Sequence, residues 1–165
     1  MVRHQQGVFC LSLGLLLGCQ GGVHPPEAIA ARADTAGVKL GLWAEDVEDA
    51  RSLALGPQGH VFVGNRGGDE VWALRDQDGD GQADERHKIA EGLNSPNGVA
   101  VLGADLYIAE IDAIWRYAGL AAEPTRSVKA QRIRSLPDKT HHGWRYLAAG
   151  PDGKLYVAIG APCNV

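Results

Sequence analysis

The feature that most constrains this chain is a pattern that occurs three times. Each copy consists of a short apolar run, a tight turn and a strand with a central aromatic residue. The aromatic residues of the three copies follow one another at intervals of 45 and 49 residues. Such self-similarity predicts stacked repeats, in which each unit covers the apolar face of the next. The copies cover residues 50–64, 96–109 and 145–158, with Phe62, Tyr107 and Tyr156 as their aromatic residues.

The residues in and around each copy predict antiparallel strands. Gly-Pro-Gln-Gly at 56–59 and Gly-Pro-Asp-Gly at 150–153 combine the fixed φ of proline with the positive φ that glycine allows, which suits hairpin turns. Further strands are expected at 70–74, 85–90, 113–117 and 130–135. Four antiparallel strands in about 45 residues are typical of a β-propeller blade. We therefore expect an all-β chain with about three propeller blades and at most one helical turn, at 44–52.

A further strand is expected before the first blade. Residues 38–44 alternate apolar side chains with others, which indicates a strand. In many propellers such a strand completes the last blade and closes the ring. Closed rings hold about four to eight blades, so three blades would leave apolar end faces uncovered. We expect residues 38–165 to be the N-terminal part of a larger propeller.

The N-terminal segment predicts an export signal followed by a tether. The apolar stretch 8–17 follows Arg3, is too short to span a bilayer comfortably and runs into Leu-Leu-Gly-Cys. This ending resembles a bacterial lipobox, so we expect residues 1–18 to be removed and Cys19 to carry lipid. Residues 19–37 are rich in Gly, Pro and Ala and indicate a flexible tether. The expected location is the periplasmic side of the outer membrane or the cell surface; the alternative is an ordinary signal peptide.

Charge and cysteine content limit the partners. The formal net charge is −4, so no basic field favours nucleic acid. Cys10 lies in the expected signal and Cys19 at the expected lipid anchor, which leaves Cys163 alone in an oxidising compartment. We expect the partner of Cys163 to lie beyond this sequence; the alternative is a buried free thiol.

An acidic loop between the first two copies is a candidate metal site. Asp76, Asp78 and Asp80 occupy positions 1, 3 and 5 of the loop, with glycine at position 6, as in calcium-binding loops. Position 12 is His87 rather than glutamate, whereas Asp84 at position 9 is similar to shorter calcium loops. The loop is therefore either a structural calcium site or a solvated acidic turn.

The third copy and its flanks resemble a known family. The segment from His142 through Gly-Pro-Asp-Gly to Gly160 resembles the glucose/sorbosone dehydrogenases, and residues 160–164 are most similar to the sorbosone dehydrogenase branch. Residues 51–66 and 93–98 also fit. The resemblance implies a six-bladed propeller that oxidises a sugar or a related alcohol or aldehyde. It also implies pyrroloquinoline quinone (PQQ) and calcium as cofactors, and leaves the electron acceptor open.

The resemblance also implies a catalytic residue. In that family a histidine eight residues before this Gly-Pro turn is the general base, and the matching residue here is His142. An imidazole has an ordinary pKa of about 6.5, so near pH 7 it can accept the proton of a substrate hydroxyl. His141 would orient its neighbour or face solvent. His60 and His87 lack this context and are expected on the surface.

Other candidate contacts are weaker. Arg51 and Arg66 lie at strand ends of the first blade and would meet an anionic cofactor, or else form surface salt bridges. Asn164 is a candidate lining residue. In the family, most quinone and calcium contacts come from later blades. Two other functions stay open: a non-catalytic scaffold propeller, and a calcium-dependent lactonase-type hydrolase, which needs carboxylates around an axial metal rather than in an outer loop.

Overall fold

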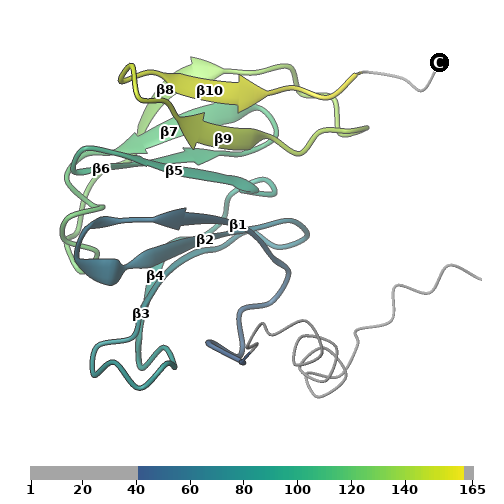
Figure 1. Ribbon diagram of the computed structural model, residues 1–165. Coiled ribbons are helices and arrows are strands. Elements are labelled where there is room, and N and C mark those ends of the chain that lie inside the picture. Colours follow the sequence, from purple (N-terminus) through teal and green to yellow (C-terminus); the bar gives the residue numbers. More distant parts are fainter. Residues whose placement is uncertain (1–40, 162–165) are drawn as a thin grey trace, which may run out of the picture. The chain divides into compact units, whose positions relative to one another are not determined.

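The chain forms an all-β structure of stacked blades (Figure 1). The computed structural model describes residues 41–161, which contain ten strands in three antiparallel sheets and no α-helix. The first sheet comprises β1 (Ala50–Leu55), β2 (Val61–Asn65), β3 (Val71–Arg75) and β4 (Glu85–Ala90). The second comprises β5 (Gly98–Leu102), β6 (Asp105–Ala109), β7 (Ala113–Tyr117) and β8 (Gln131–Ser135). The third comprises β9 (Tyr146–Ala149) and β10 (Leu155–Ala158).

These sheets confirm the expected propeller fold class. Both four-stranded sheets keep their strands in chain order, as propeller blades do. The third sheet is the inner pair of a further blade. Within residues 41–161, no helical segment has the length and apolar character that a membrane crossing requires.

The register of the inner hairpins makes the three copies equivalent residue by residue. Phe62 pairs with Ala54, Tyr107 with Ala100 and Tyr156 with Ala148. Each aromatic residue therefore lies opposite an alanine of the preceding strand. The residues one position before these alanines are therefore equivalent: Leu53, Val99 and Leu147. The residues three positions before them are equivalent as well: Arg51, Asn97 and Arg145.

The two Gly-Pro turns close their hairpins in the same way. The Gly56 N–H donates to the His60 carbonyl and the Gly150 N–H to the Lys154 carbonyl, each at 2.8 Å. A Cβ on either glycine would collide with the aromatic ring of its own copy, which explains the glycine in both turns. The expectation that His60 lies on the surface is wrong. Its side chain is 4% exposed and lies 3.2 Å from the Pro57 carbonyl, because the turn folds back over it.

The expected strand at 38–44 is not found where the structure describes it. Residues 41–47 form no strand, and residues 38–40 lie outside the described residues. Instead of joining a sheet, the segment crosses the loop before β4, where the Trp43 carbonyl accepts the N–H of Ala83 at 2.7 Å. Residues 44–52 contain a turn at 48–49 and the start of β1, without a helix.

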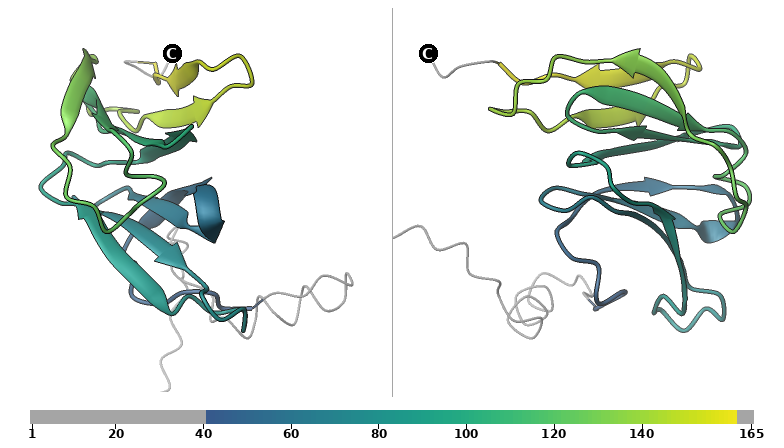
Figure 2. Two further views of the ribbon diagram at one scale, coloured as in Figure 1. Left: turned by 90° about the vertical axis from the view of Figure 1, so that its left-hand side faces the viewer. Right: turned by 180° about the vertical axis from the view of Figure 1, so that it is seen from behind.

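The blades pack through two apolar clusters. The sheets stack in chain order, as the views in Figures 1 and 2 show. Burial of these side chains is the main force that holds neighbouring blades together. The cluster between the first and second blades includes Phe62, Val71, Ala73, Val99, Leu106, Ile108 and Tyr117. The cluster between the second and third blades comprises Ala100, Ala109, Ile114 and Leu147.

Hydrogen bonds within the first blade and between neighbouring blades hold the starts of the inner strands at one end of the stack. The Arg66 N–H donates to the Asp49 carbonyl just before β1, and the Asn65 N–H donates to the Pro96 carbonyl just before β5, both at 3.1 Å. The Asn97 side-chain amide donates to the Arg145 carbonyl just before β9 at 3.0 Å. This end of the propeller therefore collects residues that lie far apart in the sequence.

Candidate functional site

A groove of about 550 Å³ lies at the gathered ends of the inner strands. It runs from the start of β1, past the residue before β5, to the start of β9. Trp144 is 40% exposed and Tyr146 is 59% exposed, so both aromatic rings are available to a ligand. The lining residues are Arg51, Ser52, Leu53, Asn97, Trp144 and Tyr146.

Arg66 and Trp144 join the first and third blades at this end. Arg66 directly follows β2, and its guanidinium carbon lies 3.9 Å from the centroid of the Trp144 ring. A guanidinium over an indole face is a favourable cation–π contact. Sequence reasoning missed Trp144, although a large aromatic residue directly after the His-His-Gly turn was a signal that could have found it.

His142 lies in the turn just before this tryptophan. The Gly143 N–H donates to the Thr140 carbonyl at 2.9 Å, and His142 has a φ of 52°. This left-handed conformation is uncommon for a residue other than glycine. Gly160, after β10, packs so closely on the His142 backbone that it has no room for a Cβ. The His142 side chain is exposed, and the His141 ring meets it edge-on at 4.2 Å between centroids.

The structure places three of the predicted site residues at this same end. Arg51 lines the groove, Arg66 stacks on Trp144, and His142 precedes Trp144 by two residues. Within residues 41–161 neither arginine forms an ion pair, so the alternative role in a surface salt bridge is not seen there. Asn164, Cys19 and Cys163 lie outside the described residues.

Two buried polar residues, Asn97 and Arg145, hold the segments that form the groove through hydrogen bonds. Arg145 is 1% exposed and donates from Nε to the Ile111 carbonyl at 3.0 Å and from Nη2 to the Pro137 carbonyl at 2.5 Å. Burial lowers the pKa of its guanidinium. Asn97 is 6% exposed, and its buried Oδ1 accepts no hydrogen bond from the described residues. Sequence reasoning missed both, because their partners lie in other blades.

The acidic loop between β3 and β4 brings three carboxylates together. Oxygens of Asp76, Asp78 and Asp80 lie within 4.8 Å of one another. The N–H groups of Gly79 and Gly81 donate to the two oxygens of Asp76 at 2.7 and 3.0 Å. The predicted fourth residue, Asp84, lies outside this group and accepts the Gln77 N–H at 2.8 Å. The trio offers hard oxygen ligands of the kind that calcium prefers.

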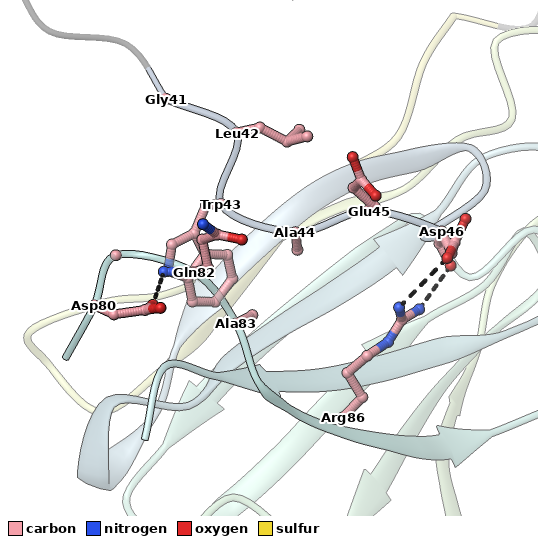
Figure 3. A pocket seen from close by; sticks show the side chains of 11 residues that line it. Gly41, Leu42, Trp43, Ala44, Glu45, Asp46, Asp80, Gln82, Ala83 and Arg86 are labelled. Carbon is pink, nitrogen blue, oxygen red and sulfur yellow. Dashed lines mark hydrogen bonds and ion pairs between the residues drawn. The ribbon is translucent and has the colours of Figure 1, made fainter. Parts of the chain in front are cut away.

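A pocket of about 690 Å³ lies beside this loop (Figure 3). Asp80 accepts the Gln82 N–H at 2.8 Å on one side, and on the other side Arg86 donates to the Asp46 carbonyl at 2.8 Å. The pocket is lined by residues 41–46 and by the loop, without any of the candidate residues of the groove.

His87, at position 12 of the loop, is partly exposed and pairs with Glu85. Its Nε2 lies 2.7 Å from the Glu85 carboxylate. This hydrogen bond lowers the pKa of Glu85. His87 is thus engaged within β4 rather than with the aspartates of the loop.

Comparison with known proteins identifies the family of the chain. Residues 36–164 match a family described as a domain of unknown function, DUF7133. The chain belongs to the DUF7133 family. No curated protein matches it.

Solved structures share the fold of this DUF7133 domain. The iodide and calcium structures of a Trichoderma reesei protein of Carbohydrate-Active Enzymes Family AA12 superpose with TM-scores of 0.63 and 0.62 at 19% identity. They cover 74% of this chain, which spans 33% and 32% of their own length. The PQQ domain of a pyranose dehydrogenase from Coprinopsis cinerea has a TM-score of 0.53 at 14% identity, over 64% of this chain and 25% of its own. The chain therefore spans about a third of the length of the Trichoderma reesei protein.

The arrangement in the DUF7133 domain suits recognition of a small polar ring. The groove combines exposed aromatic rings with a hydroxyl, an amide and a guanidinium, which is the composition of small-molecule sites. The nearby turn adds an exposed imidazole, a group able to accept a proton.

Proposed function

We propose that the protein carrying this DUF7133 domain is a PQQ-dependent oxidoreductase that oxidises a sugar or a sugar-derived alcohol or aldehyde. The observation that carries the proposal is the gathering of His142, Trp144 and Arg66 at one end of the propeller. The fold shared with the PQQ domain of the Coprinopsis cinerea pyranose dehydrogenase supports it. The motif at residues 160–164 favours the sorbosone dehydrogenase branch.

The described residues fit one side of a PQQ site. PQQ carries three carboxylates, and Arg51 and Arg66 are exposed guanidinium groups without an ion-pair partner within residues 41–161. Charged bidentate hydrogen bonds of this kind are among the strongest available to a carboxylate. We assign these two arginines to the quinone carboxylates, and Asn164 to the lining of the site. When bound, PQQ supplies the acceptor for hydride.

The proposed role of His142 is that of general base. The imidazole would accept the proton of the substrate hydroxyl while the carbon atom that carries this hydroxyl is oxidised. The electron pair of the O–H bond would then form the second bond of the new carbonyl group. The turn at 140–143 and the packing of Gly160 hold the backbone in its left-handed conformation. Uncommon backbone conformations of this kind are frequent at functional sites.

The test compares alanine variants of two neighbouring histidines in the full-length protein. His142→Ala should lower kcat by 10²- to 10⁴-fold in dye reduction with sugar, PQQ and calcium, while PQQ binding measured by absorbance is retained. The control His141→Ala should lower kcat only a few-fold. Full activity of His142→Ala would reject the base assignment.

The same assay separates the two alternative functions. A scaffold propeller would give neither an absorbance change nor dye reduction when quinone and calcium are added. A lactonase-type propeller would hydrolyse lactones with calcium and without the quinone. Either result would replace the oxidoreductase proposal.

A structural calcium ion in the acidic loop is a second proposal. Asp76, Asp78 and Asp80 would supply its ligands, with Asp84 bracing the loop through Gln77. Calcium should raise the Tm of the wild type relative to a chelator, and Asp78→Asn should remove most of that rise. If calcium does not change the Tm of the wild type, the loop is a solvated acidic turn and not a calcium site.

We also propose that the protein is an exported lipoprotein attached to the membrane at Cys19, with residues 19–37 as the tether. The lipobox-like sequence supports this proposal. Labelled palmitate should enter the wild type but not Cys19→Ser. Equal labelling would contradict the anchor.

A further inference from the structure

We propose that the groove at the starts of β1 and β9 is a binding site for a neutral saccharide ring, with Trp144 as the surface on which the ring stacks. The inference rests on the proposed function in one respect, because it names the place where the sugar ring of the substrate would lie. Its evidence comes from the exposed aromatic rings and from the polar groups that line the same groove.

The aromatic wall of the groove consists of Trp144 and Tyr146. Both side chains line the same groove. Arg66 covers the Trp144 ring at 3.9 Å, while 40% of the residue remains exposed. A tryptophan held in place by a guanidinium on one face presents a fixed apolar surface on the other. Such a surface fits the C–H face of a sugar ring.

One amide of the groove lining has a buried oxygen that lacks a hydrogen-bond donor among the described residues. Asn97 lines the groove, is 6% exposed and has a buried Oδ1 without a donor among the described residues. Its Nδ2 is already used on the Arg145 carbonyl at 3.0 Å. A sugar hydroxyl both donates and accepts hydrogen bonds, so it suits the amide of a lining residue as a partner.

The remaining lining residues fit the same ligand. Ser52 offers a hydroxyl that can both donate to and accept from a sugar hydroxyl. The volume of about 550 Å³ lies within the range of small-molecule sites. The ring would lie beside the turn that carries His142, two residues before Trp144.

The experiment follows tryptophan signals directly, without using turnover. The full-length protein is labelled with 5-fluorotryptophan, and its ¹⁹F NMR spectrum is recorded without PQQ or calcium. D-glucose, D-galactose and D-xylose are added in turn, to about 100 mM, well above the millimolar range of weak binding. The resonance that Trp144→Phe removes should shift saturably with at least one of these sugars.

A matched control is available in the same spectrum. Trp72 on β3 also lies under an arginine, with the Arg86 guanidinium carbon 5.5 Å from its ring centroid, and it does not line the groove. The resonance assigned by Trp72→Phe should stay in place. Equal shifts of both signals, or no shift of the Trp144 signal with any of the three sugars, would overturn the proposal.

Variants then test which surface holds the ring. Trp144→Ala should weaken sugar binding at least tenfold, measured by ligand-detected NMR, and Tyr146→Ala should weaken it several-fold. Trp144→Ala also removes the contact with Arg66, whereas Trp144→Phe keeps an aromatic face there and should weaken binding less than Trp144→Ala. Unchanged affinity in both variants would reject the groove as the site.

The outcomes also separate this inference from the proposed function. Sugar binding at Trp144 without PQQ-dependent turnover would keep the saccharide site and reject the oxidoreductase. PQQ-dependent sugar oxidation without a shift of the Trp144 signal would keep the oxidoreductase and reject this site.

Discussion

The first and third blades place the same residue types at the same positions of the repeat, yet their environments differ. Leu53 on β1 is 67% exposed, whereas its equivalent Leu147 on β9 is 2% exposed. Arg51 is likewise exposed, while its equivalent Arg145 is 1% exposed and bonded to carbonyls of the second blade. The difference arises because the second blade lies against this face of β9, whereas it lies against the other face of β1, and no described blade covers the face of β1 that carries Leu53. Local sequence builds the strand, and the neighbouring blade decides what its side chains do.

The largest expected effect on the free energy of unfolding distinguishes the equivalent residues Arg145 and Arg51. In this chain Arg145→Ala should lower the free energy of unfolding by about 3 kcal/mol, because it leaves two carbonyls of the second blade without donors and opens a cavity. Arg51→Ala should change the same quantity by less than about 0.5 kcal/mol. Urea unfolding measures both. Similar losses for the two variants would show that burial by the neighbouring blade is not the cause.

The leucine pair should give the next largest effect. Leu147→Ala removes a side chain that packs with Ala100, Ala109 and Ile114, and should cost about 2–4 kcal/mol. Leu53→Ala in the same chain should cost less than about 0.5 kcal/mol. The two thermal unfolding midpoints give the comparison. A large loss from Leu53→Ala would mean that the exposed face of β1 is covered in solution.

The smallest effect concerns carboxylates in the hairpin turns, which depend on their own blade only. In the second blade, Asp105 accepts the Gly119 N–H at 2.7 Å and pairs with Arg116 at 2.6 Å. The Gly119 hydrogen bond and then Arg116 lower the pKa of the Asp105 carboxyl. In the third blade, the pKa of Asp152 is lowered by Lys154 and by the Tyr156 hydroxyl.

The pH dependence follows from these directions. A carboxyl with a lowered pKa in the folded state stabilises the protein above its ordinary pKa of about 3.9, and that contribution is lost as pH falls through the folded-state pKa. Asp105→Asn should cost roughly 1 kcal/mol at pH 7 and flatten the loss of stability below about pH 4. Asp152→Asn should change the profile less, because this carboxylate is more exposed to solvent. Urea midpoints between pH 3 and pH 7 would decide; a larger effect of Asp152→Asn would contradict this ranking.

The fold could be predicted to a large extent from short-range signals. The Gly-Pro turns and the interval between copies act within a few tens of residues, and they specified the hairpins and their order. Residues 41–44 of the strand expected at 38–44 form no strand, because a strand needs a pairing partner. In the described structure that segment meets the loop before β4 instead.

The candidate site could be predicted only in part. Sequence alone determined the blades, the turn that carries His142 and the acidic trio of residues 76, 78 and 80, because each depends on local spacing. Only the tertiary structure decided that Trp144 stacks on Arg66, that Asn97 and Arg145 support the groove, and that His60 is buried. The contacts of the groove join residues from different blades. Such contacts exist only after packing, because burial of the faces between the blades brings these positions together.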